Sequence, residues 1–79
     1  MIRQLKQYTV IKSKFYINDP FDYGYKEIKL KDFSNFTDAE NWIDDNIAKY
    51  IKSSDNNTCL QIIADYNDDK CYVLASFTL

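Results

Sequence analysis

The sequence predicts an α+β fold, in which one helix packs on one face of a four-stranded, mainly antiparallel sheet, in the order ββαββ. Two alternating strand patterns precede a single stretch of helical periodicity, and two more strand patterns follow it. One helix over one sheet is the simplest two-layer arrangement for that order. With 79 residues, 46% of them hydrophobic, we expect a single small globular domain spanning residues 1–79.

The first part of the chain is expected to form a hairpin. Residues 8–17, YTVIKSKFYI, alternate along the chain and are rich in β-branched and aromatic side chains, as strands are. Residues 26–30, KEIKL, alternate again. Between them, Pro20 and Gly24 predict a long loop, because proline favours turn initiation and glycine accepts a positive φ. Phe21, in that loop, is expected to cap the edge of the core.

A helix is expected to follow. TDAE at 37–40 fits a capping box, with Thr37 as the N-cap and Glu40 bonding back to its amide. Apolar residues then recur at spacings of three and four, which gives one apolar stripe: Ala39, Trp42, Ile43, Ile47, Tyr50 and Ile51. The short polar side chains of residues 53–58 predict the end of the helix, because they compete for backbone hydrogen bonds.

Residues 59–79 predict a second hairpin, with the polar turn NDDK inside it. A register that pairs the residues flanking this turn places apolar side chains opposite one another on one face: Leu60 with Phe77, Ile62 with Ala75, and Ala64 with Val73. The same register puts Cys59 and Cys71 on opposite faces and far apart along the hairpin. We therefore expect no disulfide between them.

The composition argues against several chemistries. The chain has no histidine, and so lacks the usual general base near neutral pH. Two cysteines without histidine are too few for a structural zinc site, and a single glycine cannot build a phosphate-binding loop. The turn at 65–70 has Lys70 where a calcium loop requires glycine. We expect no enzymatic activity, no metal and no cofactor.

Charge and codon usage give hints about origin and location. Residues 1–31 carry a net charge of +4 and residues 32–79 one of −6. Residues with AT-rich codons dominate, which predicts an AT-rich genome such as that of a low-GC bacterium or its phage. The sequence MIRQLKQYTV lacks the apolar region of a signal peptide, and no stretch is long enough for a membrane span. A cytoplasmic protein without a membrane partner is expected.

The leading functional expectation is a non-enzymatic module that binds a host protein through surface tyrosines and carboxylates. The candidate residues are Asp22, Tyr23, Tyr25, Asp44 and Asp45. The acidic helix face and the NDDK turn would suit a nucleic-acid-handling partner with a basic groove. In size and composition alone, the chain resembles the small inhibitors that phages and mobile elements encode against host machinery, anti-CRISPR proteins among them. That resemblance implies an inhibitor.

Two alternatives stay open. A nucleic-acid-binding accessory domain would use the sheet face away from the helix, where we expect lysines beside Tyr8 and a second tyrosine: Lys12, Lys14, Tyr16, Lys29 and Lys31. The net acidic charge makes this the weaker alternative to protein binding. A homodimer would use apolar residues expected on the same face: Ile63, Tyr72 and Leu74.

Overall fold

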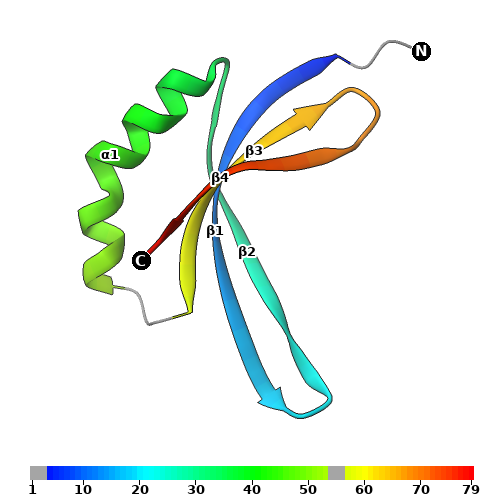
Figure 1. The fold of residues 1–79 in the computed structure, drawn as a ribbon, viewed down its shortest axis with the longest axis vertical. Helices are drawn as coiled ribbons and strands as arrows, with labels where there is room; N and C mark the ends of the chain where they lie inside the picture. Colours follow the sequence, from blue (N-terminus) through cyan, green and yellow to red (C-terminus); the bar gives the residue numbers. More distant parts are fainter. Residues whose placement is uncertain (1–3, 54–56) are drawn as a thin grey trace.

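The computed structural model describes residues 4–53 and 57–79 (Figure 1). Its elements are β1 (Leu5–Asp19), β2 (Asp22–Phe33), α1 (Phe36–Ser53), β3 (Thr58–Tyr66) and β4 (Cys71–Thr78). The four strands form one antiparallel sheet in the order β2-β1-β3-β4. The helix α1 lies along one side of this sheet. The predicted α+β class is confirmed.

The core lies between α1 and one sheet face, which we call the helix-side face. Ala39 and Ile43 of α1 are fully buried there, together with Val10 of β1 and with Leu60 and Ile62 of β3. Larger, partly buried side chains surround this centre: Tyr8, Leu30, Phe33, Phe36, Trp42, Ile47, Tyr50, Ala75, Phe77 and Leu79. Many of them are aromatic, so rings supply much of the apolar area that stabilises so short a chain.

The faces of β1 are the reverse of the expected ones. Tyr8 and Val10 were expected to face away from the helix, yet Val10 is fully buried beneath α1. Ile11 lies instead on the opposite face, which we call the outer face. Both faces of β1 carry apolar residues, so alternation alone does not identify the covered one. The pairing with β3 decides it, because Val10 lies opposite Ile62, whose side chain also belongs to the core.

The first hairpin is longer and tighter than expected, and the prediction of a long loop was wrong. β1 runs to Asp19 and β2 begins at Asp22, so only Pro20 and Phe21 form the turn. The Phe21 amide donates a hydrogen bond to Asp19 Oδ1 at 2.7 Å, which stabilises the turn locally. The Phe21 side chain is 95% exposed and does not cap the core.

The position of Gly24 differs from the expected turn. It lies within β2, opposite Tyr16, and no described glycine has a positive φ. A Cβ at this position would lie 3.4 Å from Tyr16 Oη and 3.5 Å from Tyr16 Cε1. These are ordinary van der Waals distances, so an alanine side chain would fit against the Tyr16 ring.

The helix begins earlier than the TDAE motif predicts. Asn35 is the cap, because its Oδ1 accepts a hydrogen bond from the Asp38 amide at 2.8 Å. Its Nδ2 donates in turn to Asp38 Oδ2 at 2.9 Å. Thr37 lies inside the first turn of α1. The prediction of Thr37 as N-cap was therefore wrong by two residues.

The second hairpin has the predicted register in only part of its length. Leu60 lies opposite Phe77 and Ile62 opposite Ala75, as expected. A β-bulge then shifts the pairing, so that Ile63 and not Ala64 lies opposite Val73. Both cysteines are free, and the register puts them on the same face, with Cys59 opposite Thr78 and Cys71 opposite Asp65. The expectation that they lie on opposite faces was wrong, although they do lie near opposite ends of the β3–β4 hairpin.

Candidate binding surfaces

The end of the first hairpin projects as a two-stranded arm. β3 pairs with β1 only from Leu5 to Lys14, and the Phe15 amide donates one more hydrogen bond to the Asn57 carbonyl at 3.0 Å. Beyond Phe15, β1 pairs only with β2 among the described strands. Figure 1 shows this ribbon extending past the C-terminal end of α1. We call residues 15–25 the arm. Two strands without a third strand or a covering helix are only marginally stable in water, so an arm of this length calls for an explanation beyond the fold.

One face of the arm is aromatic and exposed. Phe15 and Tyr25 lie opposite each other, with ring centroids 5.2 Å apart, and Ile17 lies opposite Tyr23. Ile17, Tyr23 and Tyr25 are 66%, 63% and 69% exposed. These residues continue the outer face of the sheet. Phe15 and Ile17 alternate along β1 on the same face as Ile11, and Tyr25 and Tyr23 lie opposite them on β2. We call this set the aromatic arm face: Phe15, Ile17, Tyr23 and Tyr25.

The other face of the first hairpin is basic at the base of the arm, where only Tyr16 belongs to the arm itself. Lys14 lies opposite Lys26, and Lys12 shares their face. Lys26 Nζ lies 5.4 Å from the centre of the Tyr16 ring, a cation–π distance. We call this set the basic arm face: Lys12, Lys14, Tyr16 and Lys26. It belongs to the helix-side face of the sheet and not to the outer face, so the predicted location was wrong.

The predicted lysine cluster is also divided. A register shift between Val10 and Ile11 leaves Lys31 on the helix-side face and moves Lys29 to the outer face. There Lys29 Nζ lies 2.6 Å from Asp32 Oδ2. A bulge reverses the alternation of side chains beyond it, and nothing in the alternating sequence marks its position.

A polar cluster on the outer face joins three strands. Thr9 Oγ1 lies 2.6 Å from Asp65 Oδ2 and 2.9 Å from Asp32 Oδ1. Gln7 Nε2 lies within 3.4 Å of both carboxylates. The hydrogen bond from Lys29 lowers the pKa of Asp32 below its ordinary value of 3.8, with Thr9 contributing in the same direction and slight burial opposing it.

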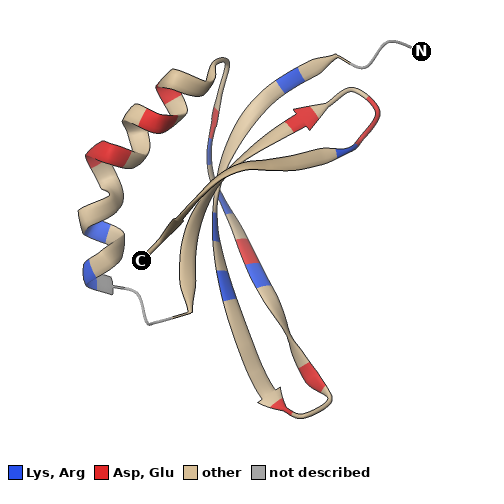
Figure 2. Ribbon diagram, in the orientation of Figure 1, with Lys and Arg blue, Asp and Glu red and all other residues tan. Residues whose placement is uncertain are grey.

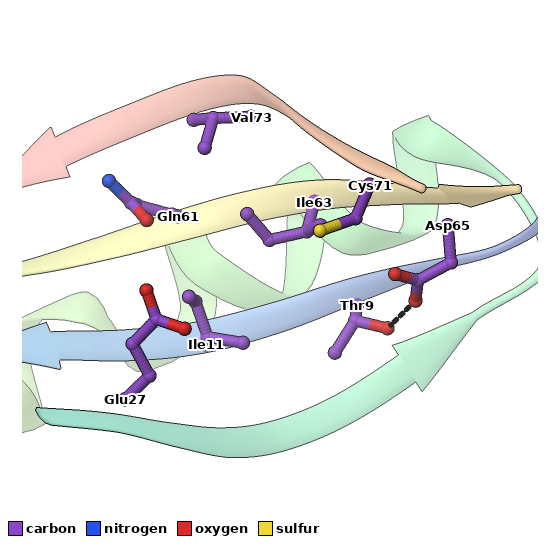
Figure 3. Close-up of a pocket in the computed structure, with 8 residues that line it drawn as sticks. All are labelled: Thr9, Ile11, Glu27, Gln61, Ile63, Asp65, Cys71 and Val73. Carbon is purple, nitrogen blue, oxygen red and sulfur yellow. Dashed lines mark hydrogen bonds between the residues drawn. The ribbon is translucent and has the colours of Figure 1, made fainter. Parts of the chain in front are cut away.

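A hollow of about 260 Å³ lies beside this cluster on the outer face. Figure 3 shows its lining side chains on the surface of the sheet, with the helix on the far side. The lining is drawn from all four strands: Thr9, Ile11, Glu27, Gln61, Ile63, Asp65, Cys71 and Val73. Sequence reasoning missed this hollow, because the inverted faces of β1 and the bulge in β4 bring Ile11 and Val73 onto one surface.

The five predicted protein-binding residues do not form one site. Asp22, Tyr23 and Tyr25 lie on the arm, where Asp22 accepts a hydrogen bond from Asn18 Nδ2 at 3.0 Å. Asp44 and Asp45 are exposed on α1. Figure 2 shows the acidic residues of α1 in the part of the helix away from its C-terminal end, and the arm extends beyond that end. The structure therefore separates the tyrosines from the helix carboxylates.

The predicted dimer residues do not share a face either. Ile63 is 8% exposed on the outer face. Tyr72 lies opposite Ala64, so the β4 bulge places it on the helix-side face. The centroid of its ring lies 5.6 Å from that of Tyr66. Leu74 is 49% exposed and has no partner in the register, because it lies at the bulge. The expectation of one apolar dimer face was wrong.

Comparisons give no further guide to the site. No family model, no curated protein and no solved structure matches this chain. Within residues 4–53 and 57–79, no three histidine, cysteine or acidic residues are grouped so that they could hold a metal ion. The same part of the chain contains no helix that is both long and apolar enough to cross a bilayer.

Proposed function

We propose that this protein is a non-enzymatic protein-binding module and that the arm is its docking element. The observation that carries the proposal is the exposure of large apolar side chains on a projecting ribbon: Ile17 at 66%, Phe21 at 95%, Tyr23 at 63% and Tyr25 at 69%. Folding gains little from rings that remain in water. Aromatic residues are enriched at protein interfaces, and tyrosine is enriched among the few residues that carry most of the binding energy.

The size of the exposed surface fits a protein partner. A fully exposed side chain of this kind offers on the order of 200 Å², so the exposed parts of these four side chains amount to roughly 600 Å². Matched by a similar area on a partner, the interface would bury about 1,200 Å², the lower end of the range for a specific complex. The resemblance of the chain to small phage inhibitors, in size and composition, favours a host protein as that partner.

Site-specific photo-crosslinking tests this proposal. A photoreactive phenylalanine analogue at position 21 should form a crosslink to one protein in a lysate of the source cell. The crosslink should be lost in the double variant Tyr23→Ser, Tyr25→Ser. The matched control is the same analogue at Ile51, which is 52% exposed on α1. Equal crosslinking from positions 21 and 51, or none from position 21, would contradict the proposal.

A second function has one observation in its favour, the basic arm face. Lys26 joins Lys12 and Lys14 beside the half-buried Tyr16, and lysines beside an accessible ring are typical of single-stranded nucleic-acid binding. The triple charge reversal of these lysines should then abolish binding to a labelled single-stranded oligonucleotide, measured by fluorescence anisotropy. The control is Lys70→Glu in the β3–β4 turn. Binding that does not weaken with salt would exclude this mode, because phosphate contacts release counterions.

A further inference from the structure

We propose that the hollow on the outer face receives a cationic side chain, arginine or lysine, of the protein partner. This inference rests on the proposed protein-binding function and specifies the chemistry of the partner. It follows from three properties of the hollow: an apolar floor, carboxylates at its margin, and continuity with the aromatic arm face. Arginine and lysine combine an aliphatic stem with a charged end, and so fit a site that is apolar in its middle and negative at its margin.

The floor is apolar and comes from three adjacent strands. It consists of Ile11 of β1, Ile63 of β3 and Val73 of β4 (Figure 3). Ile11 and Ile63 are each 8% exposed, although none of the described helices or strands covers this face, while Val73 remains 55% exposed. The neighbouring side chains therefore form a concave surface around these residues. An aliphatic stem lying on that surface would remove its own apolar area and that of Val73 from water, since Ile11 and Ile63 have little area left exposed.

The margin of the hollow is negatively charged. Glu27 and Asp65 lie toward opposite ends of it in Figure 3. The Glu27 carboxylate makes no hydrogen bond or ion pair with another described residue. Asp65 accepts from Thr9 Oγ1 at 2.6 Å and from Gln7 Nε2 at 3.4 Å through a single oxygen, Oδ2. A carboxylate offers about four acceptor positions, so Asp65 retains capacity for another donor.

No lysine or arginine of the described chain lines the hollow itself, although Lys6 and Lys70 line a neighbouring hollow that shares Asp65. Lys29, on the same face, is held 2.6 Å from Asp32 Oδ2. A cation entering the hollow would thus meet two carboxylates and a neutral amide, that of Gln61. An anionic side chain would be repelled, and a purely apolar one would leave Glu27 and Asp65 without a new partner.

The hollow and the aromatic arm face belong to one surface. Ile11, Ser13 and Phe15 follow one another on the outer face of β1. Ser13 is 4% exposed and lies between the hollow and the aromatic arm face without a large side chain to separate them. A partner that covers Tyr23 and Tyr25 would extend over the hollow, and its complementary surface would place a lysine or arginine next to an apolar patch.

An NMR titration of the full chain with a small probe tests the inference without the partner. The probe is N-acetyl-arginine amide, and its neutral control is N-acetyl-citrulline amide, which has nearly the same shape. The arginine probe should shift the backbone amides of Ile11, Ile63 and Val73 saturably, with a millimolar dissociation constant. The citrulline probe should not. Glu27→Gln should weaken binding about threefold, as expected for a solvent-exposed ion pair, and Glu40→Gln on α1 should leave it unchanged.

The outcomes separate this inference from the proposed function. Absence of saturable shifts at the three amides, an equal response to citrulline, or an unchanged affinity in Glu27→Gln would each overturn the cationic site. Glu27 is exposed, so its substitution should leave the spectrum that of the folded chain. Crosslinking from position 21 with no arginine binding would retain the arm and reject the hollow. Arginine binding with no crosslink from position 21 would reject the arm and retain the hollow.

Discussion

Replacing Ile43 by valine measures how tightly α1 is packed on the sheet. Ile43 is fully buried between the helix and the strands, and the change removes one methylene group while it keeps a β-branched side chain. Such a substitution in a core costs about 1 kcal/mol, the sum of the lost transfer free energy and a small cavity. In a domain of this size, about 1 kcal/mol lowers the midpoint of thermal unfolding by roughly 4–8 °C. Circular dichroism at increasing temperature measures that shift.

The matched control is Ile51→Val on the same helix. Ile51 is 52% exposed, so about half of the removed methylene already lies in water, and the unfolding temperature should fall by less than half as much. The comparison holds residue type and helix propensity constant and varies only burial. Equal shifts in the two variants, or no shift in Ile43→Val, would refute the packing of α1 against Val10 and Ile62.

Three further predictions concern local features. Asn35→Ala should destabilise the fold by about 1 kcal/mol in denaturant titrations, because it removes the helix cap. Thr37→Ala should cost clearly less. The reverse order of these two costs would restore the TDAE motif as the cap. The pKa of Asp32 is lowered from 3.8, so its carboxylate stabilises the fold above that pH, and this contribution is lost as the pH falls through the lowered pKa. Lys29→Met should return the pKa of Asp32 toward its ordinary value in a carboxyl ¹³C titration. An unchanged pKa in this variant would show that Lys29 is not the cause. Gly24→Ala should leave the unfolding temperature unchanged or raise it, because Gly24 has no positive φ and its nearest contacts belong to the Tyr16 side chain. A loss of more than about 1 kcal/mol in stability would show that the Tyr16 ring cannot move to admit the new methyl group.

Local patterns in the sequence were sufficient for the number, order and type of the elements. The three- and four-residue spacing of apolar residues predicted α1, and the alternation after Thr58 predicted β3 and β4. The pairing of Leu60 with Phe77 also followed from local patterning, because apolar side chains opposite one another specify a register. The hairpin turn at 67–70 was found because its polar residues interrupt two apolar runs.

The candidate sites could be predicted only in part. Tyr23 and Tyr25 were predicted from the sequence as binding residues on the surface, and both are exposed. Their setting on a strand of a projecting arm was missed, since Pro20 and Gly24 together indicate a longer loop than the chain forms. The hollow gave no sequence signal, because its residues come from four separate strands.

The sequence by itself determined which segments become strands and helix, because those choices depend on neighbours along the chain. Only the tertiary structure decided which face of β1 is covered, since both faces are apolar enough and the contacts with β3 and α1 select one. The bulges in the β1–β2 and β3–β4 pairings decided where Lys29, Tyr72 and Val73 lie. A bulge shifts every later side chain to the other face, and it arises from the fit between strands that are distant in the sequence. The surfaces that we propose for binding depend on those shifts.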